Sequence, residues 1–125
     1  MMKKRCVLMS GRLLCGDHVL DDALQKIADV VKSSANSQVE AIMATRPVEL
    51  VLFEVSQEHP AEVEIIKTLK QQFPNTVIIV IDGDGDREVI ARAFSYGAKD
   101  AFRKPYKKAL IVERVKAILS RMSRG

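Results

Sequence analysis

The sequence predicts an α/β domain in which a doubly wound parallel sheet of five strands lies between two layers of helices. Short apolar runs alternate with amphipathic segments along the chain, as expected of strands joined by crossover helices. Residues 49–55 and 76–81 are almost continuously hydrophobic, which is typical of strands covered on both faces. With 125 residues, 47% of them hydrophobic, the chain fits one compact domain over 1–125, with a short tail at 122–125.

The strands are expected at residues 5–9, 28–33, 49–55, 76–81 and 100–104. The second of them depends on how residues 17–46 fold. One interpretation is a single helix from Asp17 to about Ser33, followed by a short strand. The other is a helix at 18–27, then the strand, then a helix at 37–46. We favour the second because it alternates strands and helices strictly, and right-handed crossovers wind such a chain into three layers.

Three further helices are expected at 60–73, 86–97 and 106–122. Pro60 suits a first helical turn, Asp86 suits an N-cap, and Gly97 suits a left-handed C-terminal cap. Apolar residues at helical spacing support all three helices. In the second of them, the residues expected to face inward are Ile90, Ala93, Phe94 and Gly97.

The composition excludes several function classes. No apolar run approaches the roughly 20 residues of a membrane helix, and the basic N-terminus lacks the apolar stretch of a signal peptide. Cys6 and Cys15 form neither a CxxC pair nor a disulfide framework, so we expect free thiols in a cytoplasmic protein. The net charge is +4, but no aromatic and basic stacking pattern accompanies it, so nucleic-acid binding is not expected.

The candidate site consists of the residues at the carboxyl ends of the predicted strands, because ligands bind there in open parallel sheets. These residues are Met9, Ser10, Gly11, Glu54, Asp82, Gly83, Lys104 and Pro105. Two carboxylates and one ammonium group are therefore expected at the same edge of the sheet.

Two segments, "PVELVLFEV" (47–55) and "TVIIVIDGDGDREVIARAFSYGAKDAFRKPY" (76–106), carry a family resemblance. They resemble the receiver domain of bacterial two-component response regulators, which has the CheY-like, flavodoxin-like fold. In that family one strand ends in a phospho-accepting Asp, the next ends in Thr or Ser, and "GAxDxxxKP" closes the pattern. The resemblance runs from about Arg46 to the end of the chain, and it implies a phosphorelay signalling domain rather than an enzyme.

The chain departs from this family where phosphoryl chemistry takes place. The acidic pair that would bind magnesium maps to Met9 and Ser10, and the phospho-accepting Asp maps to Glu54, which is one methylene longer. Phosphoryl transfer needs a divalent cation and does not tolerate displacement of the nucleophile by about a bond length. We therefore expect an atypical receiver, or pseudo-receiver, without magnesium or another cofactor.

The residues that read out phosphorylation in the family have changed as well. The switch Thr or Ser maps to Asp82 and the switch aromatic maps to Ala101, so only Lys104 and Pro105 remain. Lys104 could bridge Glu54 and Asp82 permanently and so hold one fixed receiver state. Alternatively, the three side chains are solvated apart. The sequence leaves this choice open.

We expect the domain to act through protein contacts, with a signalling partner or with a second copy of itself. By resemblance, the contact surface is formed by the helix at 86–97, the strand at 100–104 and the last helix. Its candidate residues are Arg87, Arg92, Tyr96, Lys99, Arg103, Tyr106 and Lys107. Two alternatives remain: a true phospho-accepting receiver with metal ligands among Asp17, Glu58 and Asp84, and the N-terminal regulatory domain of a longer transcription regulator.

The segment "DGDGD" (82–86) also looks like the first half of a calcium loop, whose sixth and twelfth residues should be Gly and Glu. Here they are Arg87 and Ala93, so the likeness stops after its least specific part. Receivers of the nitrogen-regulation type carry "TGHGD" at this point. We therefore interpret the segment as a switch loop in which the switch hydroxyl has been replaced by Asp82.

Overall fold

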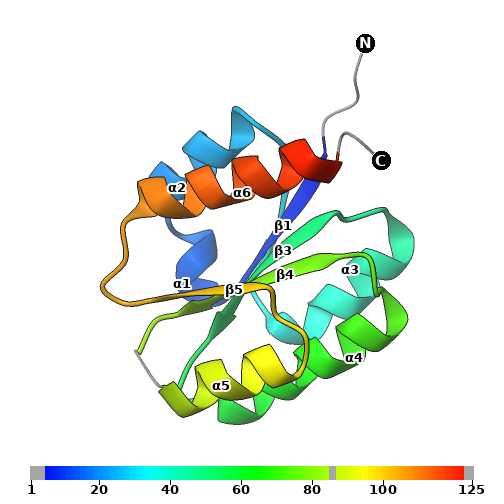
Figure 1. Cartoon of the computed structure of the whole chain (residues 1–125), viewed down its shortest axis with the longest axis vertical. Coiled ribbons are helices and arrows are strands. Elements are labelled where there is room, and N and C mark those ends of the chain that lie inside the picture. The colour runs from blue at the N-terminus through cyan, green and yellow to red at the C-terminus, as the bar shows by residue number, and fades with distance from the viewer. Residues whose placement is uncertain (1–4, 85–86, 123–125) are drawn as a thin grey trace.

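A parallel sheet of five strands forms the centre of the computed structural model, which describes residues 5–84 and 87–122 (Figure 1). The strands are β1 (Cys6–Ser10), β2 (Asp29–Ser33), β3 (Leu50–Val55), β4 (Val77–Asp82) and β5 (Asp100–Arg103). Their order is β2-β1-β3-β4-β5, and all neighbours run parallel. This is the order of the flavodoxin-like fold, so the predicted fold class is confirmed.

The helices are α1 (Arg12–Cys15), α2 (His18–Gln25), α3 (Val39–Thr45), α4 (Glu64–Gln72), α5 (Arg87–Ser95) and α6 (Lys108–Met122). Two 3-10 turns, η1 (Asn36–Gln38) and η2 (Pro60–Val63), precede α3 and α4. The alternation predicted for residues 17–46 is therefore correct, and the single long helix is wrong. The sequence did not predict α1. The predicted N-cap Asp86 lies outside the described residues.

The helices cover both faces of the sheet, and successive strand residues enter two separate cores (Figure 1). In β3 and β4, Leu52 and Ile79 pack on the side of α2 and α6. Phe53 and Val80 pack on the side of α3, α4 and α5. Because adjacent residues of a strand point to opposite faces, this alternation assigns a face to every side chain near the strand ends.

Helix α5 is rotated slightly from the predicted orientation. Val89 and Ala93 are buried, whereas Phe94, which was expected to face inward, is 45% exposed. The buried stripe follows positions four residues apart, and Phe94 lies beyond its edge. Gly97 does have the left-handed backbone expected of a C-terminal cap, with φ 116°, and a Cβ atom there would lie 2.8 Å from Lys70 Cγ.

The outer strand β2 is tied to α2 by an ion pair. Lys32 Nζ lies 2.6 Å from Asp21 Oδ2, and the Asp21 side chain is only 6% exposed. Hydrogen bonds from Lys32 and Gln25 lower the pKa of Asp21 below its usual value, more than its burial raises it. In the described part of the chain, no helix has the length and apolar character needed to cross a membrane.

Candidate functional site

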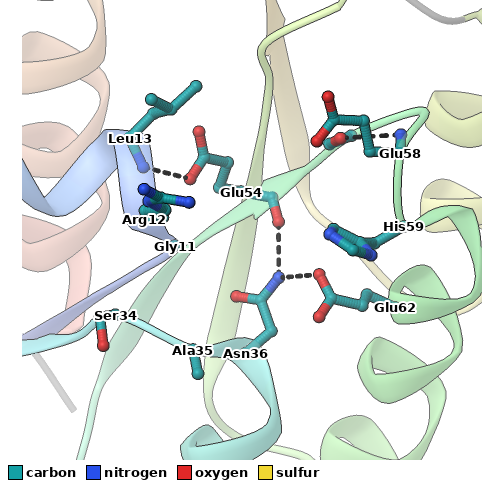
Figure 2. A pocket seen from close by; sticks show the side chains of 11 residues that line it. Gly11, Arg12, Leu13, Ser34, Ala35, Asn36, Glu54, Glu58, His59 and Glu62 are labelled. Atoms are coloured by element: carbon teal, nitrogen blue, oxygen red, sulfur yellow. Dashed lines mark hydrogen bonds between the residues drawn. The ribbon is translucent and has the colours of Figure 1, made fainter.

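Glu54, near the end of β3, is bound by the chain's own backbone. Its Oε1 accepts a hydrogen bond from the N–H of Leu13 at 3.1 Å (Figure 2). It accepts a second one from the N–H of Leu14 at 3.3 Å. These N–H groups belong to the first turn of α1, where a helix has no internal acceptors. Glu54 thus supplies the acceptor that α1 needs, because no side chain caps that helix from within.

Gly11 makes this approach possible. Its φ is 131°, a conformation that L side chains rarely adopt. A Cβ atom at this position would lie 2.2 Å from Glu54 Oε1 and 2.4 Å from Glu54 Cβ. The turn between β1 and α1 is therefore shaped to receive the glutamate.

Asn36 connects this arrangement to the neighbouring strands. Its Nδ2 donates to the backbone oxygen of Glu54 at 2.8 Å and to Glu62 Oε1 at 3.1 Å (Figure 2). Its Oδ1 accepts from Ser10 Oγ at 2.5 Å, and Ser10 and Asn36 are both buried. Sequence reasoning missed Asn36. The available signal was its place just after a strand that ends at the same edge of the sheet.

A polar cleft of about 500 Å³ opens beside Glu54 (Figure 2). Its lining includes Arg12, Asn36, Glu54, Glu58, His59 and Glu62. Burial raises the pKa of Glu54, the hydrogen bonds from Leu14 and Leu13 lower it, and the negative charges of Asp84 and Glu62 raise it again, with a net increase. The cleft carries excess negative charge, because Glu54, Glu58 and Glu62 line it together with the basic residue Arg12.

Asp82 ends β4 but leaves the sheet on the other face. The register aligns Glu54 with Ile81 and Val55 with Asp82, so the two acidic side chains point to opposite sides. Asp82 is fully buried; its Oδ1 accepts the N–H of Asp84 at 2.9 Å, and its Oδ2 has no hydrogen-bond partner in the described part of the chain.

The suggested bridge from Lys104 to both acids is not formed. Lys104 is exposed, and in the described part of the chain no ion pair joins it to Glu54 or Asp82. The physical reason is the strand register, which separates the two carboxylates by the thickness of the sheet. Lys104 does keep its place beside β4, because its N–H donates to the Asp82 backbone oxygen at 3.0 Å.

The residues at the magnesium position do not fit that ion. Met9 is fully buried among apolar side chains, and Ser10 Oγ donates its hydrogen to Asn36. Two of the alternative acids have other partners: Asp17 caps α2 and pairs with Lys108, and Asp84 Oδ2 accepts the N–H of Gln57. Glu58 lines the cleft. Within the described ranges, no three His, Cys, Asp or Glu side chains converge as metal ligands would.

The described acids of the calcium-loop segment 82–86 are also engaged by other partners. The Asp82 and Asp84 carboxylates each accept a backbone N–H instead of facing a common point. Asp86, the third acid of that loop, lies outside the described residues.

The seven residues proposed for protein contacts differ in accessibility. Arg87, Lys99, Arg103 and Lys107 are exposed. Arg92 and Tyr96 are engaged within the fold, because the Arg92 guanidinium and the Tyr96 hydroxyl each lie 2.5 Å from Glu64 Oε2.

Tyr106 is half-buried and packs into the core on the side of α2 and α6. Burial raises the pKa of Tyr106, and the negative charges of Asp17 and Glu54 raise it less. Ala101, the switch-aromatic position, packs into the opposite core. Phe102 faces the core of Tyr106, so it does not substitute for the missing switch ring.

A match to a family model assigns this domain to a known protein family. A family model described as the response regulator receiver domain matches residues 17–116. The chain belongs to the response regulator receiver family. It is therefore a receiver domain of the two-component signalling type, and the resemblance seen in the sequence is confirmed.

Solved receiver structures share the fold of this receiver domain at low sequence identity. A CheY-like receiver domain protein from Methanospirillum hungatei JF-1 superposes with a TM-score of 0.84 at 16% identity, covering 98% of both chains. A response regulator from Thermotoga maritima gives 0.80 at 23% identity, over 94% of this chain and 98% of that one. An orphan response regulator of H. pylori gives 0.77 at 23% identity, over 90% and 94%.

Proposed function

We propose that this receiver domain signals without phosphorylation. The carrying observation is that Glu54, at the phospho-acceptor position, is held by two N–H groups of α1 in a turn shaped around it by Gly11. An in-line attack on a phosphoryl donor would have to come from the other oxygen, Oε2, while these donors fix the orientation of the carboxylate. It would also require a cation to offset the charge building on the phosphoryl oxygens.

The rest of the site supports this proposal. The neutral amide of Asn36 donates hydrogen bonds to the Glu54 backbone oxygen and to the Glu62 carboxylate, so a neutral donor and not a cation contacts this acidic cluster. Met9 belongs to the apolar core instead of facing that site. The arrangement is complete without a phosphoryl group, so one receiver conformation is held by contacts within the chain.

Intact-mass measurement after incubation with acetyl phosphate and magnesium tests the proposal. We expect no gain of a phosphoryl group in the wild type, under conditions that modify a phosphorylatable receiver used as a positive control. Glu54→Gln is the matched variant, because it keeps the size and the hydrogen-bond acceptor. A gain in the wild type that is absent from Glu54→Gln would overturn the proposal.

We also propose that output proceeds by protein contacts through α5, β5 and α6. Phe94 on α5 is 45% exposed and Leu110 on α6 is 50% exposed, which leaves apolar area on this side. A shallow groove of about 420 Å³ lies between β5 and α6, lined by Asp100, Phe102, Leu110, Glu113, Arg114 and Ala117. Apolar contacts ringed by charges are typical of transient protein interfaces.

Two variants at exposed apolar residues test this surface. Leu110→Glu places a charge in the groove, and Val19→Glu places the same charge on α2, where Val19 is 66% exposed. We expect Leu110→Glu to weaken retention of the signalling partner, or of a second copy, about tenfold, and Val19→Glu to leave it unchanged. Pull-down from the source organism measures binding of the signalling partner, and light scattering measures association with a second copy. Equal behaviour of both variants would exclude this face.

A further inference from the structure

Asp82 carries a buried charge that the structure compensates only in part. The side chain is fully buried, Oδ1 accepts one backbone N–H, and Oδ2 has no hydrogen-bond partner among residues 5–84 and 87–122. An ionised carboxylate in such a place is costly unless a cation lies within reach. A compensating group is therefore expected among the neighbouring side chains.

The sheet register identifies that group as Arg103. β4 and β5 run parallel, with Asp82 aligned to Arg103 and Val80 aligned to Ala101. Aligned residues of adjacent strands point to the same face, with Cβ atoms about 5 Å apart. Arg103 therefore leaves the sheet beside Asp82, and Ala101 contributes only a methyl group to β5 on this face. In the structure, the Arg103 side chain is exposed.

Other cations near this edge fit the role less well. Lys104 lies beyond the end of β5, so it is not aligned with Asp82 in the sheet register. Arg92 is already paired with Glu64, and Arg114 Nε lies 2.7 Å from Asp100 Oδ2. Arg87, at the start of α5, follows Asp82 closely in sequence and is exposed, so it serves as a control.

We propose that Arg103 exchanges between solvent, where this structure has it, and an ion pair with Asp82. A guanidinium can donate two parallel hydrogen bonds to a carboxylate, which would satisfy Oδ2. In the paired position the positive charge is withdrawn from the β5 edge. In the exposed position it is available to an acidic partner. Binding of such a partner and the internal pair therefore oppose each other, and the linkage is reciprocal.

This exchange goes beyond the proposed function, because it does not depend on whether Glu54 accepts phosphate. It also gives Asp82 a role of its own. The carboxylate that replaces the switch hydroxyl becomes the internal competitor for a surface arginine.

A double-mutant cycle measured by urea unfolding tests the pair. We expect Arg103→Gln to lower the folding equilibrium constant about tenfold in the wild type, because it leaves Asp82 without a cation. In the Asp82→Asn background the same change should alter the constant less than about twofold. Equal effects of Arg103→Gln in both backgrounds would overturn the proposal.

Lys104→Gln and Arg87→Gln are the matched controls, since each removes one positive charge near Asp82. We expect each to change the folding constant less than about twofold, and equally in both backgrounds. If either of them couples to Asp82 more strongly than Arg103 does, the assignment of Arg103 is wrong.

The exchange itself is tested with poly-glutamate as an acidic probe. Asp82→Asn should strengthen binding of poly-glutamate at least about twofold, because Arg103 loses its internal competitor, and Arg103→Gln should weaken it. The Arg103 Nε–H resonance should shift toward that of solvent-exposed arginine in Asp82→Asn. An unchanged affinity and an unchanged resonance would show that Arg103 does not exchange.

Discussion

Glu54 and Asp82 end neighbouring strands, yet the structure surrounds them very differently. Glu54 lies at the wall of a cleft and receives two backbone N–H groups on one oxygen. Asp82 is fully buried on the opposite face, and one of its oxygens has no hydrogen-bond partner within the residues that the structure describes. The same functional group is thus an anchor where donors surround it and a source of instability where they do not. The donors within reach, and not the residue type, decide its role.

Disrupting the contacts around Glu54 should lower the free energy of unfolding the most. Gly11→Ala adds a Cβ atom 2.2 Å from Glu54 Oε1 at a φ of 131°, and we expect it to lower the free energy of unfolding. The loss should be about 3 kcal/mol, measured by urea unfolding. Gly16→Ala is the control, because the nearest atom to its added Cβ lies 3.5 Å away. Similar losses in both variants would contradict the close approach of Glu54.

Removing the Asn36 amide, which binds the Glu54 backbone oxygen, Glu62 and Ser10, should cause the next largest loss of stability. Asn36→Ala leaves the Glu54 backbone oxygen, Glu62 and the buried Ser10 hydroxyl without their partner. We expect the free energy of unfolding to fall by about 2 kcal/mol. Ser34→Ala, at an exposed position of the same cleft, should change it by less than about 0.5 kcal/mol. Thermal and urea unfolding should agree on this ranking.

On the opposite face of the sheet, substitution of Asp82 should raise the free energy of unfolding instead of lowering it. Asp82→Asn removes a buried negative charge while keeping an oxygen that can accept the N–H of Asp84. We expect the free energy of unfolding to rise by about 1 kcal/mol. Asp84→Asn should give no such gain, because Asp84 is exposed. A loss of stability in Asp82→Asn would mean that the pair with Arg103 outweighs the cost of burying the carboxylate.

The contribution of Glu54 to folding stability should depend on pH. The folded state raises the pKa of Glu54 above its usual value of 4.5, so the folded state binds the proton more tightly than the unfolded chain does. The stability from this group is therefore present at low pH and is lost as the pH rises through the interval above 4.5. Relative to Glu54→Gln, the wild type should become less stable across that interval. Urea unfolding at several pH values measures this, and a constant difference would contradict it.

The fold could be predicted from the sequence because its signals are local. The buried strands predicted at 49–55 and 76–81 match β3 and β4 closely, since an apolar run reports burial directly. The narrow buried stripe of α5 misled the prediction for Phe94, which lies at its edge.

The sequence was enough to predict which residues form the site, but not which of them contact each other. The helical turn α1 depends on Glu54, which lies far away in sequence, and the sequence around Leu13 carries no sign of it. The Lys104 bridge depended on the face from which each side chain leaves the sheet. A one-residue difference in register reverses that face, and sequence spacing alone does not fix it.

The ion pair of Lys32 with Asp21 has a consequence for how copies of this protein meet. β2 is an outer strand of the sheet, and open strand edges are the places where sheets of different molecules join into fibres. A lysine on such an edge, tethered to the adjacent helix, would have to be stripped of water before another strand could be added. The ion pair thereby opposes edge-to-edge aggregation at β2.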